Sequence, residues 1–397
     1  MYIDANVAVK LVSMFTRDLQ TPRTAAFLFG PRGTGKSTWA REILGNAWFV
    51  NLLQAEEMLL YQSQPTQFRA RVLALPKDRW IVVDEVQRAP GLLDEVHYLM
   101  EEKGYKRFLL TGSSARKLKR GAANLLAGRA LLKHLFPLTT HELGSTIPVP
   151  QLLRYGALPT SVTAEDDELR EAYLRAYVTV YLSEEIRAEG LVRNLGTFTR
   201  FLEVAALAAG QVTNVSGLAR DASISRETAR GYFEVLVDTL VGSWLPAWRP
   251  RAKVKEVALP KFYWFDPGVL RAAAGGFDNP LPADFEGIML EHLVLHEIRA
   301  HMHYANVKGT LGYWATPSGT EVDFVYSQGA RTVGIEVKHS RNWKNSFRKG
   351  LQSLCEGQKV QTWVVYQGEE EMVVDGTRVM PVASFLRRLH AGEVLGG

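Results

Sequence analysis

The sequence predicts an α/β protein with an N-terminal parallel sheet, helical central segments and a C-terminal mixed α/β region. Three observations support this fold class. A glycine-rich loop joins an apolar run to a helical stretch near residue 30, strands and helices alternate as far as residue 136, and a predicted strand hairpin carries paired acids between residues 321 and 338. Strands that alternate with helices form a parallel sheet whose two faces are covered.

The glycine-rich loop has the sequence GPRGTGKS at residues 30–37, after the apolar residues 25–29 and before a helical stretch from residue 38. Strand, loop and helix in this order are the context that the pattern G-x-x-x-x-G-K-[ST] requires. Its glycines let backbone N–H groups turn around phosphate oxygens, and the helix N-terminus adds its positive dipole end. The predicted nucleotide contacts are Gly30, Gly33, Thr34, Gly35, Lys36, Ser37 and Thr38, with Lys36 reaching the β- and γ-phosphates and Ser37 binding Mg²⁺.

A second apolar run, at residues 80–83, ends in Asp84 and Glu85. A buried parallel strand is apolar on both faces, and its carboxyl end points at the nucleotide crevice. We expect Asp84 to hold Mg²⁺ through water and Glu85 to orient and deprotonate the attacking water. The two motifs together predict hydrolysis of ATP, with ATP and Mg²⁺ as cofactors.

A further strand is predicted at residues 106–112, and it ends in small polar residues. Thr111, Ser113 or Ser114 could sense the γ-phosphate with a hydroxyl group. The alternative is a polar helix cap at Ser114, since N-cap positions favour serine. We include Ser113 in the predicted nucleotide site.

Composition limits the class of protein. The 397 residues allow two or three domains, and a content of 46% hydrophobic and 22% charged residues is ordinary for a globular protein. The single cysteine, Cys355, excludes an internal disulfide and a cysteine-rich metal site. Neither a signal peptide nor an apolar run long enough for a membrane span is present, so we expect a cytoplasmic protein without a membrane partner.

Positive charge is unevenly distributed in a chain of formal net charge +5. Residues 103–133 contain nine Lys or Arg and no Asp or Glu, and residues 331–349 contain six Lys or Arg with Glu336 as their one acid. Such clusters indicate phosphate contacts, and the alternative is a solvated surface. DNA is therefore a predicted partner.

Residues 198–248 are typical of a helix-turn-helix followed by a wing. The first short helix is expected at residues 215–220 and the second after Ser225, which would cap it. Arg226 and Arg230 would face outward near the start of the second helix, where such motifs contact DNA. The alternative is a winged helix that serves only for subunit packing.

The C-terminal hairpin places Asp323 on one predicted strand, and Glu336 and Lys338 on the next. Residues i and i+2 share a face of a strand, so Glu336 and Lys338 point the same way, and Asp323 can meet Glu336 across the hairpin. Two carboxylates can hold Mg²⁺, which lowers the pKa of a bound water, while the lysine supports charge that builds on phosphorus. The alternative is a salt-bridged hairpin without activity.

The order Asp…Glu-x-Lys resembles the PD-(D/E)XK nucleases, and this resemblance implies that Glu291, on the preceding helix, is a further metal ligand. The layout of residues 30–37, 82–88, 110–118 and 126–129 resembles the AAA-plus ATPases. That resemblance implies that Arg129, before the fifth strand, reaches the nucleotide of a neighbouring subunit in a ring, with a hexamer as the expected form. Arg116 and Arg120 are rivals for this role, and the alternative for each is a surface or DNA-facing arginine.

The whole chain resembles AAA-plus ATPases that carry a winged helix and a restriction-endonuclease-like C-terminal domain. The predicted domains are an ATPase core at 1–151, a helical lid at 152–197, a winged helix at 198–258 and the nuclease-like domain at 259–397. We expect an ATP-hydrolysing motor or remodeller that acts on DNA, including branched DNA, with a C-terminal domain that binds or cuts it. The alternative function is a nucleotide-dependent switch that binds a protein partner without acting on DNA.

Overall fold

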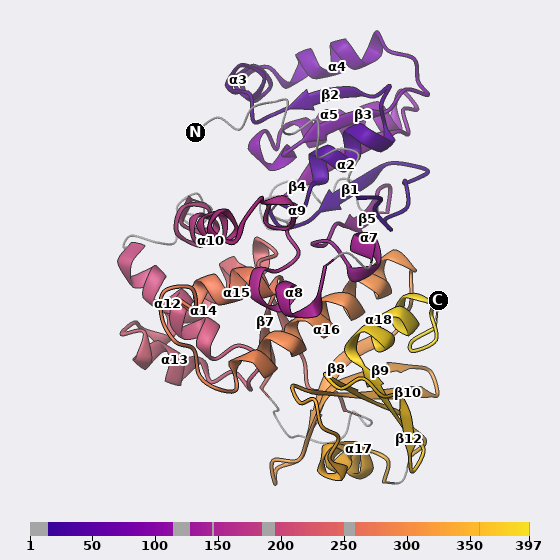
Figure 1. The fold of residues 1–397 in the computed structure, drawn as a ribbon. Coiled ribbons are helices and arrows are strands. Elements are labelled where there is room, and N and C mark those ends of the chain that lie inside the picture. The colour runs from indigo at the N-terminus through magenta and orange to yellow at the C-terminus, as the bar shows by residue number, and fades with distance from the viewer. Residues whose placement is uncertain are drawn as a thin grey trace. The chain divides into compact units, whose positions relative to one another are not determined.

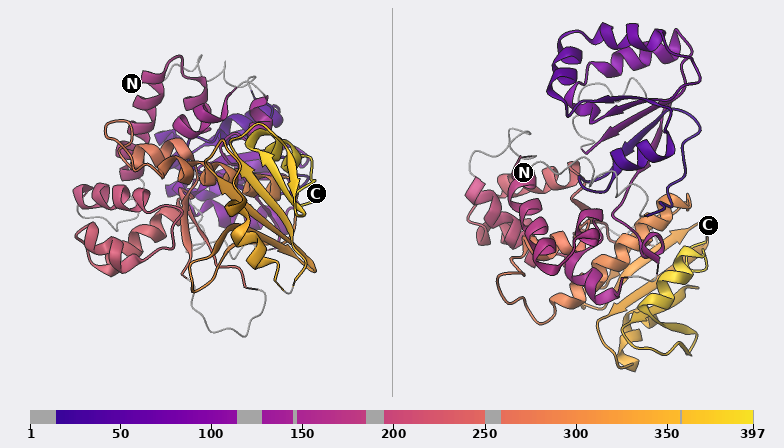
Figure 2. Two further views of the ribbon diagram at one scale, coloured as in Figure 1. Left: turned by 60° about the horizontal axis from the view of Figure 1, so that its bottom comes forward. Right: turned by 45° about the horizontal axis from the view of Figure 1, so that its top comes forward.

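The computed structural model describes residues 15–113, 128–144, 147–184, 195–249, 259–356 and 358–396. Two compact units divide the chain. The first comprises Met1–Leu138 with Asp238–Leu240, and the second comprises Thr139–Val237 with Val241–Gly397. Each unit contains its own large β-sheet (Figures 1 and 2). The predictions for Ser114, Arg116 and Arg120 concern positions outside the described residues.

The first unit is organised around a five-stranded parallel sheet in the order β2-β3-β4-β1-β5. Strand β4 lies between β1 and β3 and runs parallel to both, so the carboxyl ends of these three strands meet at one edge of the sheet. Strands β1, β3 and β4 are buried along their whole length, as a sheet covered on both faces requires. The elements are β1 (Ala26–Phe29), α2 (Lys36–Ile43), β2 (Trp48–Asn51), α3 (Ala55–Ser63), α4 (Pro65–Leu73), β3 (Ile81–Asp84), the 3₁₀ turn η1 (Val86–Arg88), α5 (Leu92–Glu101), β4 (Phe108–Gly112) and β5 (Leu131–His134).

The core of this unit lies where α4 and α5 pack on the sheet. Phe68 of α4 and Val96 of α5 are fully buried with Val83 of β3 in one apolar cluster. The ring of Tyr61 in α3 meets Phe68 edge-to-face, with centroids 5.8 Å apart. This packing fixes the position of β3, and therefore the positions of Asp84 at its end and of Glu85 directly after it.

The second unit begins with a helical region that contains one pair of strands. Asn214 caps α13 by accepting a hydrogen bond from the N–H of Gly217, and Ser225 accepts one from the N–H of Thr228 beside the start of α14. Strands β6 and β7 then pair antiparallel. The elements are α7 (Thr140–Leu143), α8 (Val149–Tyr155), α9 (Pro159–Thr163), α10 (Asp167–Ala176), the π-helical turn η3 (Tyr177–Tyr181), α12 (Leu195–Leu207), α13 (Val215–Asp221), α14 (Arg226–Asp238), β6 (Gly242–Leu245), β7 (Lys261–Trp264) and α15 (Pro267–Ala273).

Aromatic residues fill the space between α14 and the β6–β7 pair. Phe262 of β7 lies 4.8 Å from the ring of Phe233 in α14 and 4.9 Å from the ring of Trp244 in β6, measured between centroids. A Cβ at Gly242 would lie 2.1 Å from the Phe262 ring, so that position has no room for a side chain. One face of β7 is thus fixed against the helices.

The last part of the unit is a six-stranded mixed sheet in the order β12-β13-β11-β10-β9-β8. Strands β8, β9 and β10 are antiparallel neighbours, whereas β10, β11 and β13 are parallel. Helices α16, α17 and α18 pack on this sheet (Figure 1). The elements are α16 (Phe285–Tyr304), β8 (Thr310–Ala315), β9 (Glu321–Gln328), β10 (Arg331–Lys338), η4 (Asn345–Arg348), α17 (Lys349–Leu354), β11 (Gln361–Tyr366), β12 (Met372–Val374), β13 (Thr377–Pro381) and α18 (Val382–His390).

Asp266 joins two helical segments of the second unit. Its side chain is fully buried, with Oδ1 accepting a hydrogen bond from the N–H of Val269 at 3.0 Å and Oδ2 accepting one from the N–H of Ala157 at 2.7 Å. Burial raises the pKa of this carboxyl to about 6, although backbone donors oppose the shift. The side chain therefore caps α15 and holds the turn after α8 at the same time.

Candidate functional site

The glycine-rich loop lies between β1 and α2, as the sequence predicts. Gly33 and Gly35 have φ values of 84° and 89°, in the left-handed region that side chains other than glycine rarely adopt. Gly30 is required for another reason, because a Cβ there would lie 2.4 Å from the backbone oxygen of Leu135. Glycine is therefore required at these three positions of the loop, which leads into α2 at Lys36.

Lys36 is almost fully buried beneath this loop. Its Nζ donates hydrogen bonds to the carbonyl oxygens of Gly30, at 2.8 Å, and Pro31, at 3.1 Å. The Thr34 hydroxyl donates to the same Pro31 oxygen at 2.9 Å. Ser37 and Thr38 follow in the first turn of α2. A cation held at the loop and a hydroxyl at the helix start suit the phosphates and Mg²⁺ of a nucleotide.

Asp84 and Glu85 end β3 at the same edge of the sheet as the loop. Asp84 is 3% exposed, and its Oδ1 accepts a hydrogen bond from the hydroxyl of Thr111 in β4. The Thr111 hydroxyl in turn accepts the N–H of Glu85 at 3.1 Å. Thr111, one of three hydroxyls considered as γ-phosphate sensors, therefore positions the two acids.

The Glu85 carboxylate is held by two side chains. Its backbone is left-handed, with φ 60°, which turns the side chain out of the strand direction. Oε2 accepts hydrogen bonds from the amide of Gln87 and, at 3.3 Å, from the hydroxyl of Ser113. The Gln87 amide also donates to Ser113 at 3.1 Å. Gln87 is not among the site residues predicted from the sequence. Its position two residues after Glu85 is the pattern that could have indicated this contact.

Arg129 lies two residues before β5, where its guanidinium pairs with Glu101 at the end of α5. Its side chain is 41% exposed. Strand β5 runs parallel to β1, with Leu131 beside Ala26, so Arg129 is at the amino end of the strands and the glycine loop is at the carboxyl end. Arg129 is therefore not part of the phosphate site of its own chain.

A hollow of about 320 Å³ lies beside α2. Arg17, at its border, donates a hydrogen bond to the backbone oxygen of Thr34 in the glycine loop at 3.1 Å, which links the two features. The hollow is lined by residues 16–21 together with Trp39, Glu42 and Ile43.

The predicted acids of the C-terminal hairpin lie opposite each other. The register between β9 and β10 extends to the pair Phe324 and Ile335, and Asp323 and Glu336 are the residues adjacent to that pair on the two strands. Their side chains are buried, and Asp323 Oδ2 accepts the N–H of Val337 at 2.7 Å. Lys338 forms an ion pair with Glu336 Oε1. The structure thus brings together Asp323, Glu336 and Lys338.

Burial and mutual repulsion disfavour the ionised forms of these acids. Burial raises the pKa of Glu336 well above its ordinary value, and the charge of Asp323 adds to the effect. Burial also raises the pKa of Asp323. Burial alone would lower the pKa of Lys338, but the charges of Asp323 and Glu336 outweigh it and raise that pKa. The site therefore has too little positive charge to keep all of its acids ionised.

Glu291 of α16 joins the same acidic site. Its Oε2 accepts a hydrogen bond from the hydroxyl of Tyr263 at 3.1 Å, and burial, followed by the charge of Asp323, raises its pKa to about 8. Lys261 and Tyr263 of β7 lie beside this acid, and neither is among the site residues predicted from the sequence. A lysine and a tyrosine two residues apart occur on many strands, so this spacing alone does not predict a site.

A single Mg²⁺ fits the donors of the acidic site. Glu336 is 6% exposed, and its Oε2 has no hydrogen-bond partner in the described structure. Mg²⁺ is commonly bound by one or two carboxylates and keeps several waters, so Asp323 and Glu336 would suffice. Among the described residues, no group of three or more His, Cys, Asp or Glu side chains is arranged to hold a metal, so Glu291 does not complete a three-acid cluster with them.

Most of the basic residues that were predicted to contact DNA are exposed on two surfaces. Arg226 and Arg230 are exposed on α14, and Arg341, Lys344 and Lys349 are exposed after β10. Arg348 was grouped with the second surface by sequence, but the structure corrects this. Its guanidinium is buried and bonds to Asp375 at 2.7 Å and to the Val374 carbonyl at 3.1 Å, so it stabilises the fold.

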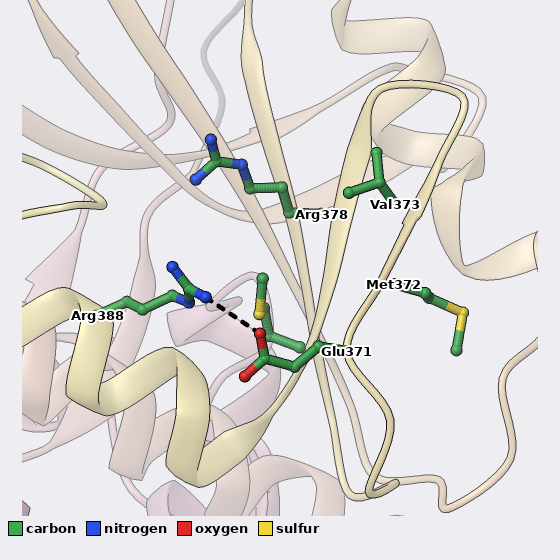
Figure 3. Close-up of a pocket in the computed structure, with 6 residues that line it drawn as sticks. Glu371, Met372, Val373, Arg378 and Arg388 are labelled. Atoms are coloured by element: carbon green, nitrogen blue, oxygen red, sulfur yellow. Dashed lines mark hydrogen bonds and ion pairs between the residues drawn. The ribbon is translucent and has the colours of Figure 1, made fainter.

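A separate shallow cavity of about 440 Å³ lies at β12, β13 and α18 (Figure 3). Arg388 pairs there with Glu371 at 3.2 Å and with Glu393 at 2.7 Å, so its charge is compensated. Arg378 lies over the ring of Trp363. Among the described residues that line this cavity Glu371 is the one acid, so they offer no paired carboxylates for a metal.

Family comparisons agree with this site. An "AAA domain" model matches residues 22–144, which contain the glycine loop, Asp84 and Glu85. The first unit is therefore an AAA-type P-loop ATPase domain. Two further models, each described as a domain of unknown function, match residues 148–279 (DUF8612) and residues 286–385 (DUF4143). Among the described residues, no helix is long and apolar enough to cross a membrane.

The chain belongs to the family of an uncharacterized protein, Rv2008c of Mycobacterium tuberculosis. The two are 30% identical over 379 residues, which cover 93% of this chain and 82% of the mycobacterial protein. The uncharacterized protein MJ1544 of Methanocaldococcus jannaschii is 21% identical over 86% of this chain and 81% of its own length. Of the solved structures, the Walker-type ATPase paby2304 of Pyrococcus abyssi is 16% identical with a TM-score of 0.41, over 63% of this chain and 90% of that protein.

Proposed function

We propose that this protein is a self-associating, ATP-driven enzyme that acts on DNA, and that its C-terminal acidic site binds or cuts the DNA. One observation carries the proposal: a single chain holds both an ATPase site and a buried acid pair, Asp323 and Glu336, with Lys338 beside it. Energy from ATP would move or remodel DNA that the acidic site engages.

At the ATPase site each residue has a distinct task. The loop N–H groups and Lys36 would bind the phosphates, while Ser37 and Asp84 would hold Mg²⁺. The bound ion neutralises phosphate charge. Glu85 would orient and deprotonate the attacking water, and Ser113, which contacts Glu85, would sense the γ-phosphate.

Self-association is supported by the place of Arg129. Because it lies at the amino end of β5, away from the glycine loop of its own chain, any contact that it makes with ATP requires a second chain. Repetition of that contact would close a ring, for which a hexamer is the expected form.

At the acidic site Asp323 and Glu336 would hold one Mg²⁺, with Glu291 as a further acid beside them. An ion held there would lower the pKa of a bound water and so supply a nucleophile for a phosphodiester. Lys338, which is held on the same face by Glu336, would stabilise charge at the phosphorus. Arg226 and Arg230, in the first turns of α14 within the predicted winged helix, and the basic run with Lys344 would contact the DNA backbone.

The deciding experiment follows both activities in the same preparations. ATP hydrolysis is measured with single-stranded, duplex and branched DNA, and the integrity of plasmid, linear and branched DNA is followed with Mg²⁺ or Mn²⁺. We expect DNA to stimulate hydrolysis. Asp323→Asn should abolish cleavage and keep the ATPase rate, whereas Glu356→Gln, an exposed acid of the same domain, should keep both activities.

Intact substrates with the wild type would exclude cutting and leave DNA binding as the role of the acidic domain. An ATPase rate that no DNA changes, together with no salt-sensitive DNA binding, would overturn the DNA proposal.

The second candidate is a nucleotide-dependent switch that binds a protein partner. It is favoured by the apolar side chains of Leu53 and Leu59 in the ATPase unit, which are 54% and 59% exposed. Salt separates the two functions, because DNA binding weakens with a slope of about −0.9 per neutralised phosphate in a plot of log affinity against log salt.

A further inference from the structure

Strand β7 directs two side chains at the acidic site, although it precedes residues 286–385 and pairs with β6. Lys261 is 2% exposed, and its Nζ donates a hydrogen bond to Glu321 Oε1 at 2.8 Å. Tyr263, two residues later and so on the same face, is fully buried and donates to Glu291. Both side chains thus contact acids of the last domain.

These two contacts act on the acids differently. Lys261 is surrounded by negative charge: burial lowers its pKa, but the charges of Glu291, Asp323 and Glu321 outweigh burial and raise it. The ammonium is therefore charged and compensates acids that would otherwise attract a cation. The Tyr263 hydroxyl is neutral and fixes one oxygen of Glu291 in place.

The opposite face of β7 is anchored among the helices. Phe262 lies against Phe233 of α14, whereas Tyr263 lies 4.7 Å from the ring of His292 and 6.1 Å from that of Phe324. The strand therefore connects the helix that carries Arg226 and Arg230 to the acids. The orphaned Oε2 of Glu336 is the independent sign that these acids take a ligand.

We propose that Tyr263 and Lys261 are positioning residues of a divalent-cation site at Asp323 and Glu336, with Tyr263 holding Glu291 beside the site and Lys261 limiting the affinity. The inference rests on the proposed function of the acidic site. It makes that site composite, built by two domains that separate family models match.

The test measures Mn²⁺ binding to the full-length, nucleotide-free protein by electron paramagnetic resonance at pH 7.5. The signal counted is the Mn²⁺ that the wild type binds and Asp323→Asn does not. Tyr263→Phe should weaken this binding about fivefold, the usual effect of one lost hydrogen bond. Lys261→Met should tighten it about tenfold, since a cation beside the site is removed.

Two matched variants control for general effects. Tyr326→Phe removes the hydroxyl of another fully buried tyrosine of the second unit, which bonds to the Lys308 carbonyl and to Gln328. Lys308→Met removes an exposed cation. Neither should change Mn²⁺ affinity. A merely structural role would lower the melting temperature and weaken binding in both β7 variants, rather than shift affinity in opposite directions.

The outcomes separate the inference from the function on which it rests. A wild type that binds no Mn²⁺ above the Asp323→Asn level overturns the metal site and the inference together. Wild-type binding that Tyr263→Phe and Lys261→Met leave unchanged, or weaken alike, overturns the inference alone. If Lys261→Met does not fold, Tyr263→Phe decides, because it keeps the buried ring.

Discussion

The ATP site draws its groups from one loop and two neighbouring strand ends, whereas the acidic site draws its charges from β7, α16, β9 and β10. The glycine loop offers N–H groups and Lys36 to an anion, and most of its geometry is set within residues 30–37. The acidic site sets Lys261 and Lys338 against Glu291, Glu321, Asp323 and Glu336. A site made by one local turn can be recognised from its motif, and a site made by distant strands depends on how the chain folds.

The largest expected effect tests whether the ATP site of one chain requires an arginine from a second chain. Arg129→Ala should lower the ATPase turnover by roughly 10³-fold or more, by analogy with arginine fingers, and leave ATP affinity nearly unchanged. Mixing Arg129→Ala with Lys36→Ala chains should restore part of the rate. A monomeric protein with full turnover would contradict this prediction.

A second prediction separates the two sites. Glu85→Gln should reduce ATP hydrolysis by about 10²- to 10⁴-fold, the range for loss of a general base, while ATP still binds. Mn²⁺ binding at the acidic site should not change, since that site is made by other residues. Lys36→Ala is the companion variant, and it should weaken nucleotide binding itself. Wild-type turnover in Glu85→Gln would remove the role given to this acid.

The third prediction concerns how the free energy of unfolding of the second unit depends on pH, because this unit contains the buried carboxyl of Asp266. The pKa of Asp266 is about 6, above its ordinary value of 3.8, so the folded state holds this proton more tightly than the unfolded state. The resulting stabilisation is present below pH 4 and is lost as the pH rises through 6. Chemical denaturation of the wild type and of Asp266→Asn, which does not titrate here, should show their difference in unfolding free energy falling by up to about 3 kcal/mol between pH 4 and 7.

The smallest expected effect concerns the DNA surface beside the acidic site. Lys344→Ala should reduce the salt slope of DNA binding by about 0.9, because one phosphate contact is lost. Lys308→Ala, an exposed lysine on a different loop, should not change the slope. Equal slopes for Lys344→Ala and the wild type would show that DNA does not reach this surface.

Much of the local structure could be predicted from the sequence. The strand–loop–helix order, the acids Asp84 and Glu85 where β3 ends, and the cap Ser225 follow from patterns within a few residues of one another. The hairpin register of Asp323 and Glu336 also follows, because a tight turn fixes which residues of two strands are opposite.

Contacts between distant segments could not be predicted in this way. Lys261 meets Glu321, and Tyr263 meets Glu291, across long stretches of chain. Arg348 has the composition of a surface cation, yet folding buries it against Asp375. The domain boundaries at residues 151, 197 and 258 stay predictions, as do the roles assigned to the acidic residues.

The contacts on the two faces of β7 limit which segments of this protein could be separated by gene fusion. A gene fusion that carried residues 286–385 into another protein would bring Glu291, Asp323 and Glu336 but leave behind the hydroxyl and the ammonium that β7 supplies. The transplanted domain would carry buried acids whose neighbours had been lost. Recombination should therefore keep the two C-terminal domains as one heritable block, while the ATPase unit, whose phosphate loop is made within its own strands, is the part free to be exchanged.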